Sequence, residues 1–501
     1  MIASPAGTPF VIDALALTES ASPALQLGGT GEPPLTLFLS GSRSQLPATV
    51  EASGHRWQAT IPLLASRWGS PPMAPPSGRY HFDPPLEATA SLSASLPDAR
   101  LVPGRFRIAF DTADSTIAVV FSAPLTDAEN GKEQQHGLET QYRTTEYLPF
   151  NAVYFESFYG QNAACNPLAL DRALATARPD IPRYWSVRDT SVAVPAGAIA
   201  VLEGSEEWWR IRGAARLIVI NDWLRNRYRK RRHQKVLQTW HGTMLKKLAL
   251  SRSGLRLRLR PTLATLRERA RWSILLSQNH YATRIFRRAY LYTGPVWEEG
   301  YPRDDQLLSG NAAAVRAKLG IPDDVKVLLY APTWRDDRPD HVDHLDVSHF
   351  TDQLGSGYVT LIRGHSRTLQ PGTDLRAGGV IDVTSYPDVS ELFLIADALI
   401  TDYSSVMFDF SVTGKPIFFF TPDLDRYREV LRGFYFDLIA VAPGPVVREP
   451  DELIELVRKL DDADGQYAEK YAAWRARFNP RDDGKAAERI IARVLREGIL
   501  D

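Results

Sequence analysis

The division into apolar and polar positions is clearest in residues 398–420, ALITDYSSVMFDFSVTGKPIFFF. The apolar run Ala398–Thr401 predicts a strand, and residues 417–420 predict a second, buried strand. Between them Asp402 is a residue type favoured at a helix N-cap, and the Gly-Lys-Pro sequence at 414–416 is a helix-ending signal. The pattern therefore predicts strand, helix, strand, a unit that binds ligands at the carboxyl ends of its strands.

Two serines follow Asp402 where the predicted helix begins. The first backbone N–H groups of a helix have no intrahelical partner, so with the hydroxyls of Ser404 and Ser405 they suit an anion such as phosphate. The alternative is an ordinary turn whose serines face solvent. These residues alone favour neither interpretation.

Apolar runs alternate with helical spacing in two long series, which predicts an α/β fold. The expected strands of the first series are 150–155, 183–187, 198–202 and 215–220, with helices at 167–177 and 206–212. The second series begins at 325–330 and runs through 358–363, 380–382 and 392–396 before it reaches 398–420. Two Rossmann-like, doubly wound domains that face a cleft follow from this pattern.

The N-terminal residues differ in composition. They are rich in Pro, Ser, Ala and Thr and have short β-like runs between turn residues. This pattern predicts a sandwich-like β-rich accessory domain. Trp57, Trp68 and Tyr80 are either part of its core or a face on which carbohydrate stacks. Since 501 residues are too many for one core, we expect three domains, at 1–146, 147–300 and 301–501.

Charge is balanced overall, with 59 basic and 59 acidic residues, but residues 221–288 contain only Asp222 and Glu268 as acids. Arginines alternate with leucines between residues 255 and 269, which favours an amphipathic element on anionic lipid. A nucleic-acid patch and a solvated helical face are the alternatives. With Cys165 as the single cysteine and no apolar run of the ~20 residues that cross a bilayer, we expect a cytoplasmic protein at the inner face of the cell membrane.

Reactive side chains follow several expected strands. His241 stands in VLQTWHGT, where a strand leads to a glycine turn and the imidazole is available as a general base, unless it is only bonded to backbone. His365 follows another strand in the same way, and the turn after residue 330 carries Thr333 and Arg335, which suit phosphate oxygens. Three histidines near residue 345 have spacing that fits no metal site, so we read that segment as a polar loop and expect no metal or cofactor.

The combination TWHGTMLKKL, GYPRDDQL, YAPTWRDD, IRGH and ITDYSSVMFDF resembles the CDP-glycerol glycerophosphotransferase family, which includes teichoic-acid primases and polymerases and related capsule enzymes. The similarity extends from about residue 150 to 437 and includes the turn FESFYGQNAACNP. It implies a GT-B fold, with the CDP-glycerol or other CDP-polyol donor on the second domain and the acceptor on the first.

The resemblance also implies roles for single residues. His241 matches the proposed catalytic base and His365 a second histidine near the transferred phosphate. Contacts to the donor diphosphate are implied at Thr333, Arg335, Ser404 and Ser405. Asp402 and Asp409 are implied to shape the helix entrance there or to reach the polyol or ribose of the donor. Acceptor contacts are implied at Gly160, Asn162, Gly242 and Thr243.

The predicted activity is transfer of a polyol-phosphate, glycerol-phosphate above all, to a hydroxyl of a lipid-linked teichoic-acid or capsule-type acceptor, with release of CMP. One departure from the family is Met244, where a proline commonly follows the motif threonine. Another is the N-terminal region, which leaves the acceptor undetermined. The alternatives are a GT-B glycosyltransferase that uses a nucleotide sugar and a glycan-binding protein without activity.

Overall fold

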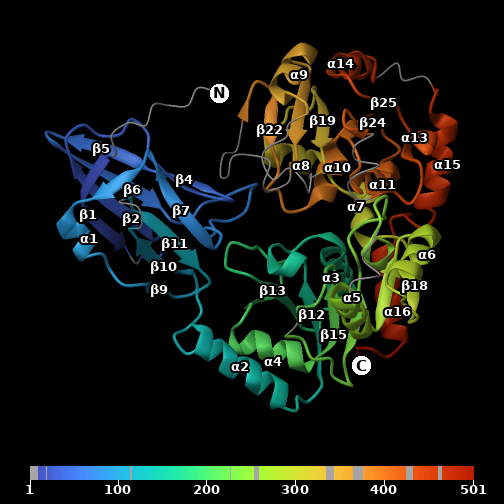
Figure 1. The fold of residues 1–501 in the computed structure, drawn as a ribbon, viewed down its shortest axis with the longest axis horizontal. Coiled ribbons are helices and arrows are strands. Elements are labelled where there is room, and N and C mark those ends of the chain that lie inside the picture. The colour runs from blue at the N-terminus through green and yellow to red at the C-terminus, as the bar shows by residue number, and fades with distance from the viewer. Residues whose placement is uncertain are drawn as a thin grey trace.

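The computed structural model describes residues 10–18, 20–112, 116–225, 227–252, 259–333, 344–364, 376–424, 433–460 and 465–500 (Figure 1). Of the predicted site residues, Arg335 and His365 lie outside these ranges. His341, one of the three histidines read as a polar loop, also lies outside them.

The N-terminal β region consists of two sheets around one apolar core. One has the order β5-β6-β2-β1-β8 and the other β4-β3-β7-β11-β10-β9. In β6 every second residue is buried, as expected for strands that cover a core on one face. The strands are β1 (Phe10–Thr18), β2 (Ala24–Thr30), β3 (Phe38–Gly41), β4 (Gln45–Pro47), β5 (Thr49–Ser53), β6 (Arg56–Pro62), β7 (Gly78–Asp83), β8 (Leu86–Ala88), β9 (Arg100–Val102), β10 (Phe106–Asp111) and β11 (Ala118–Ser122), with the short helix α1 (Ala90–Ala94).

The aromatic residues of this region do not form one exposed face. Trp57 and Tyr80 are buried in the core, each 1% exposed, so the suggestion of a stacking surface made by these two with Trp68 is wrong. Trp68 instead leaves the β region and contacts Tyr386 edge to face, with 5.3 Å between the ring centroids.

The first α/β unit has a seven-stranded parallel sheet with the order β14-β13-β12-β15-β16-β17-β18. The chain order reverses between β12 and β15, which is the point where such sheets place their ligands. The elements are β12 (Phe150–Glu156), α3 (Cys165–Ala177), β13 (Arg183–Val187), β14 (Ile199–Leu202), α4 (Glu206–Ala214), β15 (Ala215–Ile220), β16 (Lys235–Gln238), α5 (Leu259–Arg271), β17 (Ile274–Ser277), α6 (His280–Ala289) and β18 (Val296–Glu298).

The second α/β unit repeats this plan with the order β21-β22-β20-β19-β23-β24-β25, all parallel except β21. Its order reverses between β19 and β23. The elements are α7 (Gln306–Ser309), α8 (Ala312–Leu319), β19 (Lys326–Ala331), α9 (Val347–Leu354), β20 (Tyr358–Ile362), β21 (Arg376–Ala377), β22 (Val380–Asp382), α10 (Val389–Ile395), β23 (Ala398–Thr401), α11 (Val406–Phe410), β24 (Ile417–Phe420), α13 (Leu438–Val441), β25 (Val446–Val447), α14 (Pro450–Arg458) and α15 (Ala468–Phe478).

The prediction of an α/β fold with parallel sheets is confirmed. Strands 183–187 and 215–220 begin and end where the sequence placed them. Their residues are almost all buried, as is typical of parallel strands that are covered on both faces.

Two helices outside residues 150–300 pack on the first α/β unit. The helix α2 (Lys132–Thr144) lies beside α4, with the ring centroids of Tyr142 and Trp209 4.9 Å apart. The C-terminal helix α16 (Ala486–Arg496) returns from the second unit and packs on α3, where Ile490 and Val494 share a core with Val153 (Figure 1).

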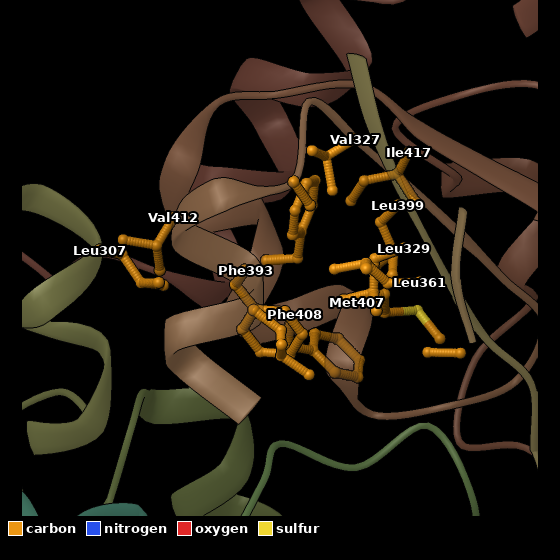
Figure 2. Close-up of a cluster of buried hydrophobic side chains, with 14 of the residues drawn as sticks. Leu307, Val327, Leu329, Leu361, Phe393, Leu399, Met407, Phe408, Val412 and Ile417 are labelled. Atoms are coloured by element: carbon orange, nitrogen blue, oxygen red, sulfur yellow. The ribbon is translucent and has the colours of Figure 1, made fainter. Parts of the chain in front are cut away.

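The core of the second unit lies between its sheet and helices that include α10 and α11 (Figure 2). Leu329, Leu361 and Leu399 contribute from three neighbouring strands, and Met407 and Phe408 contribute from α11. All five side chains are buried. The packing of this core therefore fixes the position of α11. It also fixes the turn before α11 that carries Ser404 and Ser405, which we call the serine turn.

We expect Leu399→Ala to lower the free energy of unfolding by about 2–5 kcal/mol, because it leaves a cavity in this core. Denaturant unfolding measures the change. Leu308→Ala is the matched control, since Leu308 is 52% exposed in the same unit and its loss should cost little. Equal losses in the two variants would contradict the packing described here.

Candidate active site

His241 lies in a tight turn at the carboxyl end of β16. The turn is fixed by Thr239, whose N–H donates to the carbonyl of Ile220 at 2.7 Å, and by Trp240, which has a left-handed φ of 57°. The imidazole stacks on the indole of Trp240 at 10° and 5.1 Å. The ring is therefore held on one face by an aromatic surface.

The Nδ1 atom of His241 lies 2.6 Å from the carbonyl oxygen of Asn221, at the end of β15. A carbonyl only accepts hydrogen bonds, so Nδ1 carries the proton and Nε2 is the basic nitrogen. Burial lowers the pKa of His241, while the charge of Asp222 opposes the shift. The imidazole is thus neutral at pH 7, and its Nε2 atom suits a general base.

The turn after β12 holds Asn221 in place through its side chain. The Asn221 side chain donates to the hydroxyl of Ser157 at 3.3 Å and accepts from the N–H of Phe158 at 2.9 Å. Ser157 in turn donates to Asn162 at 2.9 Å. Gly160 packs so closely on β13 that an added Cβ would lie 3.0 Å from the N–H nitrogen of Arg188. Asn162 is thus joined to the histidine turn through two other side chains.

Thr243 does not face a ligand. It is fully buried, its hydroxyl donates to Gln278 at 2.5 Å, and it accepts from Asn279 at 3.1 Å. The expectation that Thr243 contacts the acceptor is corrected here, because its polar atoms support the turn from inside the protein.

The serine turn lies at the carboxyl end of β23, next to the end of β19. Asp402 is not the N-cap that the sequence suggested: its carboxylate accepts from the N–H groups of Thr333 at 2.9 Å and Tyr403 at 2.5 Å. Ser405 occupies the N-cap position, and α11 begins only at Val406. Asp402 thus joins the two strands at the reversal point of the sheet, and Ser404 and Ser405 remain half-buried beyond it.

Gly242 brings the two turns together. Its φ is 155°, and a Cβ added there would lie 3.0 Å from the hydroxyl oxygen of Ser405. A side chain at this position would therefore push the serine turn away. The absence of one lets the residue after His241 touch the second α/β unit directly.

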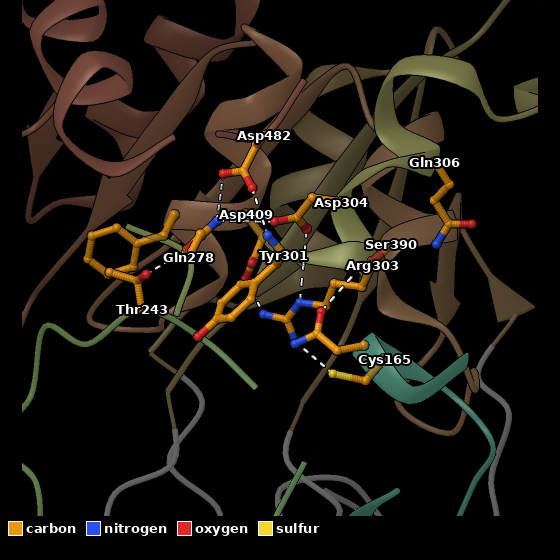
Figure 3. A network of polar contacts seen from close by, with 12 residues as sticks. Cys165, Thr243, Gln278, Tyr301, Arg303, Asp304, Gln306, Ser390, Asp409 and Asp482 are labelled. Atoms are coloured by element: carbon orange, nitrogen blue, oxygen red, sulfur yellow. Dashed lines mark hydrogen bonds and ion pairs between the residues drawn. The ribbon is translucent and has the colours of Figure 1, made fainter. Parts of the chain in front are cut away.

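Arg303 links the two units close to this contact, and its polar partners are drawn in Figure 3. Its guanidinium donates to Asp409 on α11 at 2.6 Å and to the thiol of Cys165 on α3 at 3.1 Å. Its backbone N–H donates to Asn166 at 3.2 Å, and Asn166 donates to the carbonyls of Thr239 and Trp240. One arginine thus positions both the helix after the serine turn and the backbone that carries the histidine.

Asp409 is one of three buried carboxyl groups near Arg303. Burial is the main cause that raises the pKa of Asp482 to about 7, and burial with the charge of Asp409 raises the pKa of Asp304 well above its usual range. Gln278 donates to both Asp304 and Asp482. Arg303 lies closer to Asp409, at 2.6 Å, than to Asp304, at 3.9 Å, so Asp409 is its main ion-pair partner.

Sequence reasoning did not assign a role to Arg303, although it stands in GYPRDDQL, one of the stretches that carried the family resemblance. An arginine followed by two aspartates in a segment between the expected domains was the available signal. Asp409 was expected to shape the helix entrance or to reach the donor, and its Oδ2 atom is bound by Arg303.

Two further results concern the described residues only. Within them, no group of three or more histidine, cysteine, aspartate or glutamate side chains is arranged to hold a metal ion. None of their helices is long and apolar enough to cross a bilayer.

The fold and this geometry define a two-unit α/β protein that brings a basic histidine of one unit against a serine turn of the other. The chain belongs to the CDP-glycerol:poly(glycerophosphate) glycerophosphotransferase family, whose model matches residues 140–496. The β region lies almost entirely outside that match.

Comparisons with known proteins agree with this family. The chain is 35% identical to a teichoic acid glycerol-phosphate transferase of Staphylococcus aureus (strain NCTC 8325 / PS 47), over 72% of this chain and 97% of the relative. It is 35% identical to a teichoic acid poly(glycerol phosphate) polymerase of Bacillus subtilis (strain 168), over 69% of this chain. It spans about half the length of that polymerase and of a similar one from Staphylococcus epidermidis (strain ATCC 35984 / DSM 28319 / BCRC 17069 / CCUG 31568 / BM 3577 / RP62A).

Among solved structures, the wall teichoic acid polymerase TagF aligns with a TM-score of 0.68 and 35% identity, over 73% of this chain and 94% of that chain. A variant of TagF soaked with CDPG aligns with a TM-score of 0.67.

We expect Arg303→Met to lower the free energy of unfolding by about 3–5 kcal/mol, because it leaves the Asp409 carboxylate buried without its partner. Thermal or denaturant unfolding measures the loss. The matched control is the double variant with Asp409→Leu, which removes both charges and should recover part of the stability. A double variant that is less stable than the single one would show that the pair is not the main interaction of Arg303.

The lowered pKa of His241 predicts the pH profile of any reaction in which it is the base. A base works when unprotonated, so kcat/KM should rise with pH through an inflection below 6.5 and be level at pH 7. Steady-state rates from pH 5 to pH 8 measure the profile. An inflection above 6.5 would contradict the neutral imidazole described here.

Proposed function

We propose that this chain transfers glycerol-phosphate from CDP-glycerol to a hydroxyl of a teichoic-acid-type acceptor and releases CMP. The observation that carries the proposal is the contact of the two turns at Gly242, which brings the residue after His241 against Ser405 of the other unit. Family membership and the names of the relatives, which are glycerol-phosphate transferases and polymerases, support the same activity.

In this reaction His241 removes the proton from the acceptor hydroxyl, with the Asn221 carbonyl stabilising the imidazolium that forms. The hydroxyl oxygen then attacks the phosphorus that carries glycerol. A new P–O bond forms as the bond between this phosphorus and the bridging oxygen of the diphosphate breaks, and CMP leaves with that oxygen.

The donor is assigned to the second unit. Thr333, Ser404 and Ser405 lie at the reversal point of its sheet and are proposed to contact the diphosphate, together with Arg335. Asp402 and Asp409 are proposed to position these groups through the bonds described above. His365 is proposed to act near the transferred phosphate, as the family resemblance implies.

The acceptor is assigned to the first unit, with Gly160, Asn162 and Gly242 at the turns nearest His241. We propose that the two units form a GT-B arrangement with the β region as an accessory domain. The proposed division is 1–146, 147–300 and 301–501, with α2 and α16 belonging by packing to the middle part.

We also propose that the protein acts at the inner face of the cell membrane on a lipid-linked acceptor. The support is α5, where Leu259 and Leu263 are 80% and 50% exposed next to basic side chains such as Arg260 and Arg267. Exposed leucines among arginines suit the surface of an anionic bilayer.

The test is CMP release from CDP-glycerol and from CDP-ribitol in the presence of a lipid-linked glycerol-phosphate acceptor. We expect release with CDP-glycerol, and a decrease of about 10²–10⁴-fold in kcat for His241→Ala, the range for loss of a general base. The matched control is His280→Ala, since the His280 side chain is 75% exposed.

The other outcomes are equally informative. Release only with CDP-ribitol would change the polyol. Turnover only with nucleotide sugars would replace the proposal by glycosyl transfer. Folded protein without turnover that binds glycan through its β region would favour a binding protein.

A further inference from the structure

A cavity of about 330 Å³ lies where the β region meets both α/β units. The β region contributes residues 42–46 and the loop 65–76, the first unit residues 161–163 and 191–193, and the second unit Arg363 with residues 382–387. In Figure 1 the end of the β region that carries β4 points toward the two α/β units. The volume falls within the ~300–1,000 Å³ that small-molecule sites occupy.

The wall made by the β region is fixed to both units. Trp68 packs edge to face on Tyr386 of the second unit, with 5.3 Å between ring centroids. On the first unit the buried carboxylate of Asp189 accepts from the N–H of Ser77 at 2.7 Å and lies 3.9 Å from the guanidinium of Arg43. The β region is therefore seated on the site-bearing units, and is not an appendage.

The cavity has the chemistry of an anion site. Three arginines line it, Arg43, Arg67 and Arg363, together with the carboxylate of Asp382. Asp189 lies 3.9 Å from Arg43, and one guanidinium nitrogen of Arg363 donates to two backbone carbonyls of residues 383–386. The indole N–H of Trp68, which also lines the cavity, is buried and has no hydrogen-bond partner in the described part of the chain. Guanidinium groups and an unused N–H donor suit the oxygens of a phosphodiester.

The cavity also adjoins the proposed acceptor side of the active site. Asn162 lines it and is joined through Ser157 and Asn221 to His241. An acceptor whose terminal hydroxyl lies at His241 would therefore carry its preceding phosphodiesters toward this wall. The described residues assigned to the donor diphosphate, Thr333, Ser404 and Ser405, do not line the cavity.

We propose that Arg43 and Arg67 of the β region, with Arg363, bind a phosphodiester of the acceptor chain in this cavity. The proposal rests on the function proposed above and adds to it a subsite that the first 139 residues, outside the family match, help to form. The β region thus selects an acceptor that already carries polyol-phosphate units.

The test uses the full-length protein with Arg43→Gln, Arg67→Gln and the double variant. Binding of a synthetic glycerol-phosphate hexamer without lipid or CDP is measured by calorimetry, and KM is measured separately for the acceptor and for CDP-glycerol. We expect the double variant to raise the Kd for the hexamer and the KM for the acceptor about tenfold or more, with the KM for CDP-glycerol unchanged. Arg56→Gln is the control, since Arg56 is exposed in the same region and bound to Asp13.

Each other result overturns the assignment. A change confined to the KM for CDP-glycerol would show that the cavity binds the donor diphosphate instead of the acceptor. Unchanged Kd and KM values in folded variants would show that these arginines form no acceptor subsite. Trp68→Phe, which removes the N–H together with part of the ring, should weaken hexamer binding in protein that remains folded. Because hexamer binding needs no turnover, failure of the proposed transfer reaction would be seen separately as wild-type protein that binds hexamer and releases no CMP.

Discussion

The buried ion pair between Arg303 and Asp409 is the interaction on which the geometry of the site depends. Two charges removed from water require each other, because an unpaired one would cost several kcal/mol. Through this pair the segment between the units is bound to α11, and through Cys165 and Asn166 the same arginine is bound to α3 and to the histidine turn. The site is therefore assembled by the buried bonds of Arg303, while the proposed ligand-binding groups in the described part of the chain take no part in these bonds.

Glycine at position 242 shows how little separates the two halves. A single methyl group there would meet the Ser405 hydroxyl at 3.0 Å, and the φ of 155° is unfavourable for any other residue. The close approach of the two units brings the turn that carries His241 next to the hydroxyl donors of the serine turn. No long side chain is needed to reach from one unit to the other. Rigid placement of this kind is what reduces the entropic cost of bringing two substrates together.

Much of the fold could be predicted from sequence because parallel strands buried on both faces give continuous apolar runs, as in β13 and β15. Part of the site could be predicted too, since His241 and the serines follow such strands. The helix start at Asp402 was predicted wrongly, because its carboxylate is used by a neighbouring strand 69 residues away. Arg303 and Asp409 are 106 residues apart, so no local pattern indicates that they meet.

The return of α16 to the first unit means that the chain crosses between the units twice. The two crossings are bonded to each other: Asp305 accepts from the N–H groups of Ala486 and Ala487, and Asp482 accepts from that of Tyr301. Three backbone N–H groups of these connections are therefore held by two carboxylates, and each bond joins one crossing to the other. A substitution at Asp305 or Asp482 would consequently loosen both connections between the units at once.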